Sequence, residues 1–297
     1  MQRRKFLYST LLTMAAIRTQ GKATAFFSPA EWKITMLTDY LGIFTESGGT
    51  IFFNLSQSGI IVVDSQFPAS VPHLIEELKK KGMPFHLLVN THHHGDHTSG
   101  NIVFKPLISR VIAHVNSLYN QEVVARRQNS LDKQYFPTET FSESTVVKTG
   151  DQQINLNYFG AAHTNGDAVI HFERENVAHV GDLVFNRRHP FVDRSAGANI
   201  KSWISVLQKI RSHYDDDTTF VFGHAGEGYQ VTGKKQDILA FEDYLSRVLD
   251  YVKGQIKAGN SLQEIIEKTT GIPGAAEWKG EGISRPLTAA YEELTTS

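Results

Sequence analysis

Residues 91–97, with the sequence THHHGDH, constrain this chain more than any other stretch. They place four of the 13 histidines and one carboxylate within seven residues. Residues 85–90, just before them, form an apolar run that predicts a buried strand. Because side chains alternate in direction along an extended chain, His92 and His94 should point the same way and His93 should point away.

A turn into a helix at Gly95 would present Asp96 and His97 side by side at the start of that helix. Neutral imidazoles and carboxylates are the ligands of zinc and of its neighbours among the transition metals. A solvated histidine cluster in a surface loop is the alternative explanation of so short a motif. The rest of the chain has to decide between the two.

The composition excludes several classes of function. The chain has 30 Lys and Arg against 31 Asp and Glu, with no long basic run, so we expect no binding to nucleic acid or anionic lipid. Cysteine is absent, which excludes disulfides, thiolate metal ligands and a cysteine nucleophile. No apolar run reaches the roughly 20 residues that span a bilayer. The expected partner of the mature protein is therefore a small-molecule substrate.

Residues 1–25 have the pattern of a cleaved export signal. A basic start (MQRRK) is followed by moderately apolar residues 6–17 and by a small-residue cleavage site at residues 23–25. The run RRKFL resembles the twin-arginine signal of bacteria. An amphipathic first helix of the fold is the alternative. We expect the export machinery to be a partner of the precursor, the mature domain to span residues 26–297, and its location to be periplasmic or secreted.

The remaining chain alternates between strand and helix patterns in two halves. Strands are predicted at residues 33–37, 41–45, 50–55, 60–63, 85–90, 111–114, 144–148, 153–159, 168–172, 177–180 and 218–222. Helices are predicted after Ser70, at 115–128, 199–213, 235–256 and 261–269, and after Pro286. Residues 129–143 show no clear period and are expected to be a loop. This order favours one domain with two mixed sheets covered by outer helices, and with a helical C-terminal part over residues 235–297.

Three further candidate ligands, His163, Asp182 and His224, each come directly after a predicted strand. A glycine lies close before each of them. Strand ends at one edge of a sheet converge in space, and glycine lets the chain turn there without crowding. Taken singly, each residue has an ordinary alternative as a turn cap, a helix cap or a satisfied core histidine. Together with residues 91–97 they predict one metal site, and the other histidines are expected to be structural.

These motifs resemble those of the metallo-β-lactamase superfamily. THHHGDH is similar to its T-H-x-H-x-D-H signature, and GAAHTNGD, HVGDLVF and FGHAGEG are similar to its later motifs, in the same order. The resemblance extends over residues 33–230. It implies an α+β fold, a four-layer αββα sandwich, with a dinuclear site at one edge of the two sheets.

The resemblance also implies a ligand set for two ions, with two triads and one bridging aspartate. These are His92, His94 and His163 for the first ion, Asp96, His97 and His224 for the second, and Asp182 between them. The expected cofactor is two zinc ions per chain, with iron and manganese as alternatives. Asp64, after the strand at 60–63, falls where relatives keep an aspartate that supports the ligands. A strand-ending turn residue is the alternative at that position.

This ligand set predicts a hydrolase. Three histidines leave the first ion an open position for water, and a hydroxide that bridges two cations is nucleophilic at neutral pH. Asp96 would orient the nucleophile and receive its proton. The expected target is the carbonyl of an ester, thioester, lactone or amide, the β-lactam amide included. The alternatives are a β-lactamase proper, a non-catalytic periplasmic metal-binding protein and a phosphodiesterase.

Subfamilies of this superfamily differ in the residue found at single positions of the site. Zinc β-lactamases of the cysteine-bearing subclass have cysteine where Asp182 stands and arginine where His97 stands, and both residues here resemble the ligands of glyoxalase-type thioesterases and lactonases. The flanks NTHHHGDHTSGN and GAAHTNGDAVIHF nevertheless resemble that β-lactamase subclass. Its members also have a lysine that binds the drug's carboxylate, where this chain has Phe185. Arg187 or Arg188 is the candidate substitute for that lysine, with a solvated surface as the alternative.

Overall fold

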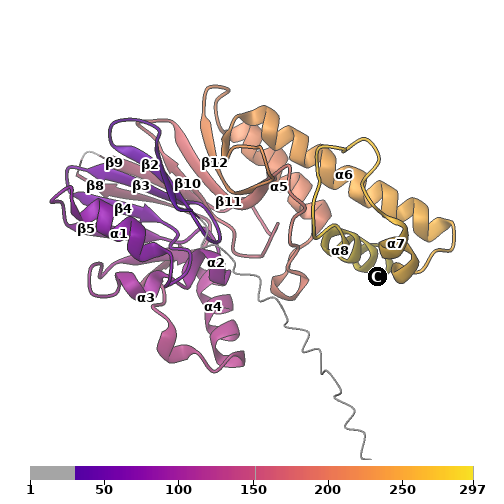
Figure 1. The fold of residues 1–297 in the computed structure, drawn as a ribbon, viewed down its shortest axis with the longest axis horizontal. Helices are drawn as coiled ribbons and strands as arrows, with labels where there is room; N and C mark the ends of the chain where they lie inside the picture. The colour runs from indigo at the N-terminus through magenta and orange to yellow at the C-terminus, as the bar shows by residue number, and fades with distance from the viewer. Residues whose placement is uncertain (1–30, 151, 297) are drawn as a thin grey trace, which may run out of the picture. The chain divides into compact units, whose positions relative to one another are not determined.

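The structure, a computed structural model, describes residues 31–150 and 152–296 (Figure 1). The predicted export signal at residues 1–25 lies outside these ranges. Within them, no helix is both long enough and apolar enough to cross a membrane.

The first half of the described chain forms a seven-stranded sheet whose strands lie in sequence order. Its strands are β1 (Lys33–Met36), β2 (Leu41–Thr45), β3 (Ile51–Ser56), β4 (Gly59–Val63), β5 (Phe85–Val89), β6 (Val111–His114) and β7 (Glu139–Phe141). Strands β1 to β4 pair antiparallel, and β4 to β7 pair parallel. Its helices are α1 (Val71–Lys79), α2 (Gly95–Thr98), α3 (Asn101–Phe104) and α4 (Val115–Arg127).

The second half forms a six-stranded sheet in the order β13-β12-β11-β10-β9-β8. Its strands are β8 (Ser144–Thr149), β9 (Gln152–Asn157), β10 (Val169–Phe172), β11 (Val177–Asn186), β12 (Thr219–Ala225) and β13 (Thr232–Gly233). Strands β11 and β12 are parallel, and the other pairs are antiparallel. The helices that follow are α5 (Ile200–His213), α6 (Lys235–Lys257), α7 (Leu262–Lys268) and α8 (Ser284–Thr295).

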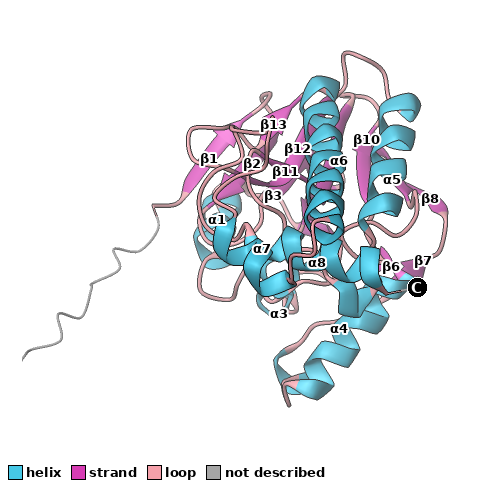
Figure 2. Cartoon of the chain, turned by 90° about the vertical axis from the view of Figure 1, so that its right-hand side faces the viewer, coloured by secondary structure: helices cyan, strands magenta, loops and turns pink. Residues whose placement is uncertain are grey.

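Side-chain alternation along the strands produces four layers. In β4, Ile61 and Val63 join the apolar cluster between the two sheets, whereas Ile60 and Val62 join the cluster beneath α1. A third cluster lies between the second sheet and the helices α5 and α6, which Figure 2 shows lying over β10 to β13. Because central strands such as β3, β4 and β11 are buried on both faces, both sheets need a cover on each side. The predicted αββα sandwich is therefore confirmed.

Residues 129–143 are not the continuous loop that the sequence predicts. A short 3₁₀ helix, η1, spans Leu131–Lys133, and β7 follows it at Glu139–Phe141. Three residues are too few to show an alternation of polar and apolar side chains. Strand β7 forms because its backbone pairs with β6 at the edge of the first sheet.

Two strands of the second sheet are longer than predicted. Strand β11 continues to Asn186 and β12 to Ala225, so Asp182 and His224 lie within strands instead of following them. The register between β11 and β12 shifts at Gly181, whose φ is 51°. Such a bulge interrupts the alternation and redirects the next side chain, which makes the strand appear to end early in the sequence.

The last helix also differs from its prediction at one end. Helix α8 begins at Ser284, two residues before Pro286, whereas the sequence predicts a start after the proline. A proline in the first turn of a helix costs no hydrogen bond, since the amides there have no partner within the helix. The helix therefore includes the proline instead of following it.

Candidate metal site

The predicted ligands meet near the carboxyl ends of β5, β11 and β12. His92 and His94 lie in the loop after β5, and α2 begins at Gly95, as predicted, so Asp96 and His97 lie in its first turn. The other three come from the loop between β9 and β10 (His163), from β11 (Asp182) and from β12 (His224). The structure brings all seven side chains together in two adjoining groups.

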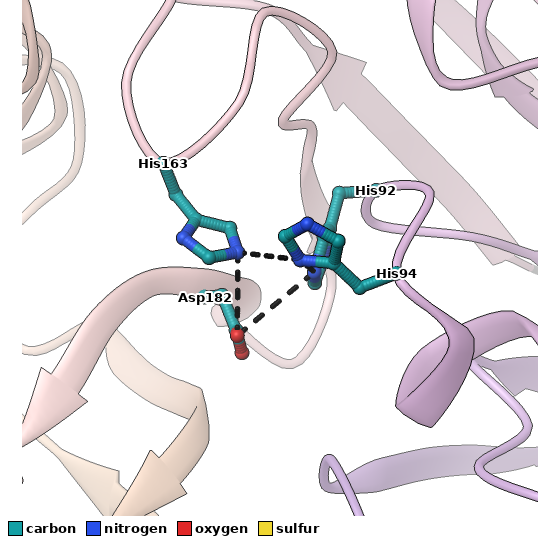
Figure 3. Close-up of side chains that lie close together, drawn as sticks. All are labelled: His92, His94, His163 and Asp182. Atoms are coloured by element: carbon teal, nitrogen blue, oxygen red, sulfur yellow. Dashed lines mark hydrogen bonds and ion pairs between the residues drawn. The ribbon is translucent and has the colours of Figure 1, made fainter. Parts of the chain in front are cut away.

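The first group holds three imidazole nitrogens and one carboxylate oxygen (Figure 3). His94 Nδ1 lies 3.1 Å from His92 Nε2 and 2.9 Å from His163 Nε2. Oδ2 of Asp182 lies 3.9 Å from His92 Nε2 and 3.5 Å from His163 Nε2. A single imidazole nitrogen has either one proton or one lone pair, so His94 Nδ1 cannot satisfy both neighbouring nitrogens. A cation between the three rings would accept all three lone pairs.

The second group consists of Asp96, His97 and His224. His224 Nε2 lies 3.1 Å from Asp96 Oδ2 and 3.5 Å from Asp182 Oδ1. His97 Nε2 lies 3.1 Å from the same oxygen of Asp182. Asp182 therefore turns Oδ2 toward the first group and Oδ1 toward the second, which is the arrangement of a bridging carboxylate.

Two atoms at the centre show that the residues fit a bound cation. His97 Nε2 and Asp182 Oδ1 are buried and lie 3.1 Å apart, but neither atom has a partner at hydrogen-bonding geometry. An unsatisfied buried polar group costs about 1–3 kcal/mol. A divalent cation bound to both groups would remove that cost. Nitrogen and oxygen donors in these numbers suit zinc, iron or manganese.

Burial and charge set the protonation of the ligands. Burial lowers the pKa of His92 well below its usual range and that of His163 to about 3, so both imidazoles are neutral and have a free lone pair at pH 7. Burial alone would raise the pKa of Asp182, but His224 and His97 outweigh it and hold the pKa well below its usual range. The pKa of Asp96 falls to about 2 because His97 and His224 likewise outweigh its burial. Both carboxylates are therefore ionised at neutral pH.

Asp64 lies behind the ligands and holds two of them. His97 Nδ1 donates to Asp64 Oδ2 at 2.7 Å, which turns Nε2 of that ring toward Asp182, where a bound cation would replace its proton. The amide of Thr91 donates to Asp64 Oδ1, and the Thr91 hydroxyl donates to Oδ2. That hydroxyl in turn lies 3.1 Å from His92 Nδ1. The φ of Asp64 is 65°, a conformation of about 1–3 kcal/mol strain for a residue with a side chain, so the surroundings must hold it in place.

Two glycines allow the ligands to approach closely. A Cβ on Gly49 would lie 2.1 Å from Cε1 of His97, and a Cβ on Gly223 would lie 1.9 Å from Oδ1 of Asp182. Gly49 is not among the residues that the sequence predicts for the site. The pair GG at residues 48–49 indicates a turn, but nothing local shows that a ring from α2 packs against it.

A cavity of about 370 Å³ opens beside the two groups. It is lined by His94, Gly95, Asp96, Asp182, Phe185, Arg188, His189, Phe191, His224 and Arg285. Of the two arginines that the sequence predicts as a clamp, only Arg188 is part of this lining. Arg187 lies against Asp237 at 2.9 Å and over the ring of Trp278, so its guanidinium is already engaged. Arg285 of α8 also lines this cavity, and no motif of the sequence predicts it there.

Comparison with known proteins identifies the family. The model of the metallo-beta-lactamase superfamily matches residues 49–224, more than half of the chain. The chain therefore belongs to the metallo-β-lactamase superfamily and is a metal-dependent hydrolase.

Two curated relatives show how the similarity is distributed. The chain is 22% identical over 234 residues to a metallo-beta-lactamase type 2 of Elizabethkingia meningoseptica, which covers 75% of this chain and 89% of that protein. It is 30% identical over 164 residues to 2,4-dinitroanisole O-demethylase subunit alpha of Nocardioides sp. (strain JS1661). That second match covers 52% of this chain and 48% of the demethylase subunit, so it spans about half of either protein.

Solved structures share the fold. A metallo-beta-lactamase from Pontibacter korlensis superposes with a TM-score of 0.62 at 18% identity, over 73% of this chain and 99% of that one. The inverting sec-alkylsulfatase Pisa1 from Pseudomonas sp. superposes with a TM-score of 0.69 at 14% identity, over 90% of this chain and 50% of that one. At these identities the likeness shows a common fold alone.

We predict that Gly49→Ala weakens metal binding at the second group. The added methyl group would lie 2.1 Å from Cε1 of His97 and must displace that ring. The measurement is a titration in which the protein and a chelator compete for Zn²⁺. The wild-type protein should show two affinities, and in the variant the affinity of the second group should fall by about 10-fold or more.

The matched control is Gly254→Ala in α6, where a Cβ would meet nothing within 4 Å. It should leave both affinities unchanged and stabilise the fold by about 0.5–1 kcal/mol. Identical metal binding by the two variants would contradict the assignment of His97 as a ligand.

Proposed function

We propose that this protein is an exported hydrolase that uses two zinc ions to cleave an ester, thioester, lactone or amide carbonyl. The observation that carries the proposal is the convergence of two ligand groups on the two oxygens of Asp182. When bound, a pair of divalent cations would acidify the water between them and polarise the substrate's carbonyl oxygen. Iron and manganese remain alternatives, because they accept the same donors.

Asp96 is the proposed residue that orients the attacking water. Its side chain is 31% exposed and lines the cavity, whereas that of Asp182 is 4% exposed. A carboxylate with a pKa of about 2 is ionised at neutral pH and accepts a hydrogen bond from water. It is a weak base at that pKa, so its principal role is orientation, and it would hold the proton only briefly before the leaving group takes it.

The walls of the cavity favour a small substrate with an apolar part. The ring of Phe185 stacks on His224 at 5.4 Å, and the ring of Phe191 lies 5.4 Å from that of His94. Phe191 is 43% exposed, so part of its ring is open to a ligand. These two rings would exclude water from one side of the reacting group.

The β-lactam amide remains within the proposed substrate range. The relative from Elizabethkingia meningoseptica is named a metallo-beta-lactamase, and this supports β-lactams as candidates. Phe185 stands where the resemblance implies a lysine that binds the drug's carboxylate, and this argues for weak hydrolysis of such drugs. The relative from Nocardioides adds 2,4-dinitroanisole to the compounds that should be tested.

Asp96→Asn should keep the fold and lower turnover by about 100-fold or more, the range typical of losing a group that orients the attacking water and accepts its proton. The measurement uses Zn²⁺-loaded protein with nitrocefin, a lactone, a thioester, a phosphodiester and 2,4-dinitroanisole, and follows the best substrate in the variant. The control is Asp132→Asn in η1, an exposed aspartate outside the cavity lining, which should keep full activity. Unchanged turnover in Asp96→Asn would disprove the catalytic role.

We propose that Arg188, with Arg285 beside it on the cavity lining, binds an anionic group of the substrate. In the described part of the chain, no ion pair or hydrogen bond engages either guanidinium. A charged hydrogen bond contributes about 1.5–3 kcal/mol, which corresponds to a 10-fold to 100-fold effect on binding.

Arg188→Ala should therefore lower kcat/KM for a carboxylate-bearing substrate by about 10-fold or more and spare its neutral ester. Arg127→Ala, at an exposed position of α4, is the control and should change neither value. An equal loss for both substrates would show that Arg188 does not select for charge.

We also propose that the protein is exported through the twin-arginine route. The support is the pattern of residues 1–25, and a route that carries folded proteins suits a metal that is loaded before export. N-terminal sequencing of the protein recovered from the periplasm or the medium should show a start near Phe26. Recovery of the full-length chain from the cytoplasm alone would refute this location.

A further inference from the structure

His94 uses a different ring nitrogen from the other two histidines of the first group. It presents Nδ1 to His92 and His163, whereas those two rings present Nε2. The opposite nitrogen of His94, Nε2, lies 2.9 Å from Oδ2 of Asp193. Because an ionised carboxylate only accepts hydrogen bonds, this contact places the proton of His94 on Nε2 and leaves the lone pair on Nδ1.

Three of the other ligand histidines show why this contact matters. The outer nitrogen of His97 donates to Asp64, that of His163 donates to the carbonyl of Phe191 at 2.8 Å, and that of His92 lies against the hydroxyl of Thr91. In each case the outer partner fixes the tautomer and aims the inner lone pair. Asp64 is the carboxylate behind the second group, and Asp193 occupies the corresponding place behind the first.

Asp193 is itself held in place. It is 8% exposed and lies at the start of the 3₁₀ helix η2 (Arg194–Ala196). Its Oδ1 accepts from the hydroxyl of Ser195 at 2.6 Å and from the amide of Ala196 at 3.1 Å. Its Oδ2 faces the histidines.

His93 completes the surroundings of that carboxylate. Its side chain lies outside both ligand groups, as the alternation along residues 91–97 predicts, and its Nε2 lies 3.4 Å from Asp193 Oδ2. The two oxygens of Asp193 therefore have separate roles, because Oδ1 caps the turn and Oδ2 faces His94 and His93.

We propose that Asp193 is a positioning residue of the metal site, which holds His94 with Nδ1 turned toward the first ion. This inference deepens the proposed function, because it rests on the assignment of His92, His94 and His163 as metal ligands. Neither the motifs of the sequence nor the family match assigns a role to this aspartate. Its contribution should appear in metal affinity, which is measured without a substrate.

The decisive variant is Asp193→Asn. Its amide oxygen can stay at the Oδ1 position and accept from Ser195 and Ala196, so the turn keeps its cap. Its amide nitrogen then takes the Oδ2 position and faces His94 Nε2 as a second donor. The variant therefore opposes the tautomer that exposes Nδ1 and leaves the local fold in place.

The measurement is a chelator-competition titration with Zn²⁺ in a His224→Ala background, which isolates the first group. Asp193→Asn should weaken that affinity by about 10-fold to 100-fold, the effect typical of a lost partner behind a ligand. With His224 intact, the affinity of the second group should stay unchanged, as should the Tm of the metal-free protein. Asp193→Ala, which also removes the cap, should lower that Tm.

Three results would overturn the inference, and they differ in what else they overturn. Wild-type affinity in Asp193→Asn would exclude the positioning role and leave the proposed function intact. Equal weakening of both groups, together with a lower Tm of the metal-free protein, would show that Asp193 acts on the fold alone. Failure of the wild-type protein to bind Zn²⁺ would overturn both this inference and the proposed function.

Discussion

The structure depends on one buried carboxylate that serves two groups of ligands. Asp182 turns one oxygen to the histidines of the loops and the other to those of α2 and β12. A charge in this position is costly unless it is paired, since ionised groups lose several kcal/mol of hydration on burial. Cations would compensate that loss, and because the unfolded chain cannot gather the same ligands, metal binding and folding are thermodynamically coupled. The site is thus a source of stability as well as of chemistry.

The two sheets act as a rigid frame for this carboxylate. The amide and the hydroxyl of Thr50, in the turn before β3, both donate to the carbonyl of Gly223 in β12, at 2.9 and 3.0 Å. The imidazole of His179 in β11 donates to the carbonyl of Thr50 at 3.0 Å. These contacts join the first sheet to the second within one residue of His224. The position of His224 in the second ligand group is therefore set by the packing between the sheets.

The sequence predicts the layered fold and the convergence of the candidate ligands well where the signal is local. Alternation over residues 91–97 places His92 and His94 together, because a period of two residues needs no tertiary information. Prediction from the sequence fails where a residue's role depends on contacts between distant segments. Asp193 lies 99 residues from His94, in a turn with no preceding strand to mark it. The role of Arg285 depends on which turn of α8 reaches the cavity, and this is determined by how α8 packs against the rest of the protein.

The C-terminal helices lie beyond the segment that the family model matches, yet α8 contributes Arg285 to the wall of the cavity. The ligands come from the sheets, their loops and the short helix α2, and this part of the wall comes from a separate layer. Mutations in α8 can therefore change the lining of the cavity without altering the two ligand groups. Such a separation would let the shape and charge of the cavity change through α8 while the ligand groups keep their geometry.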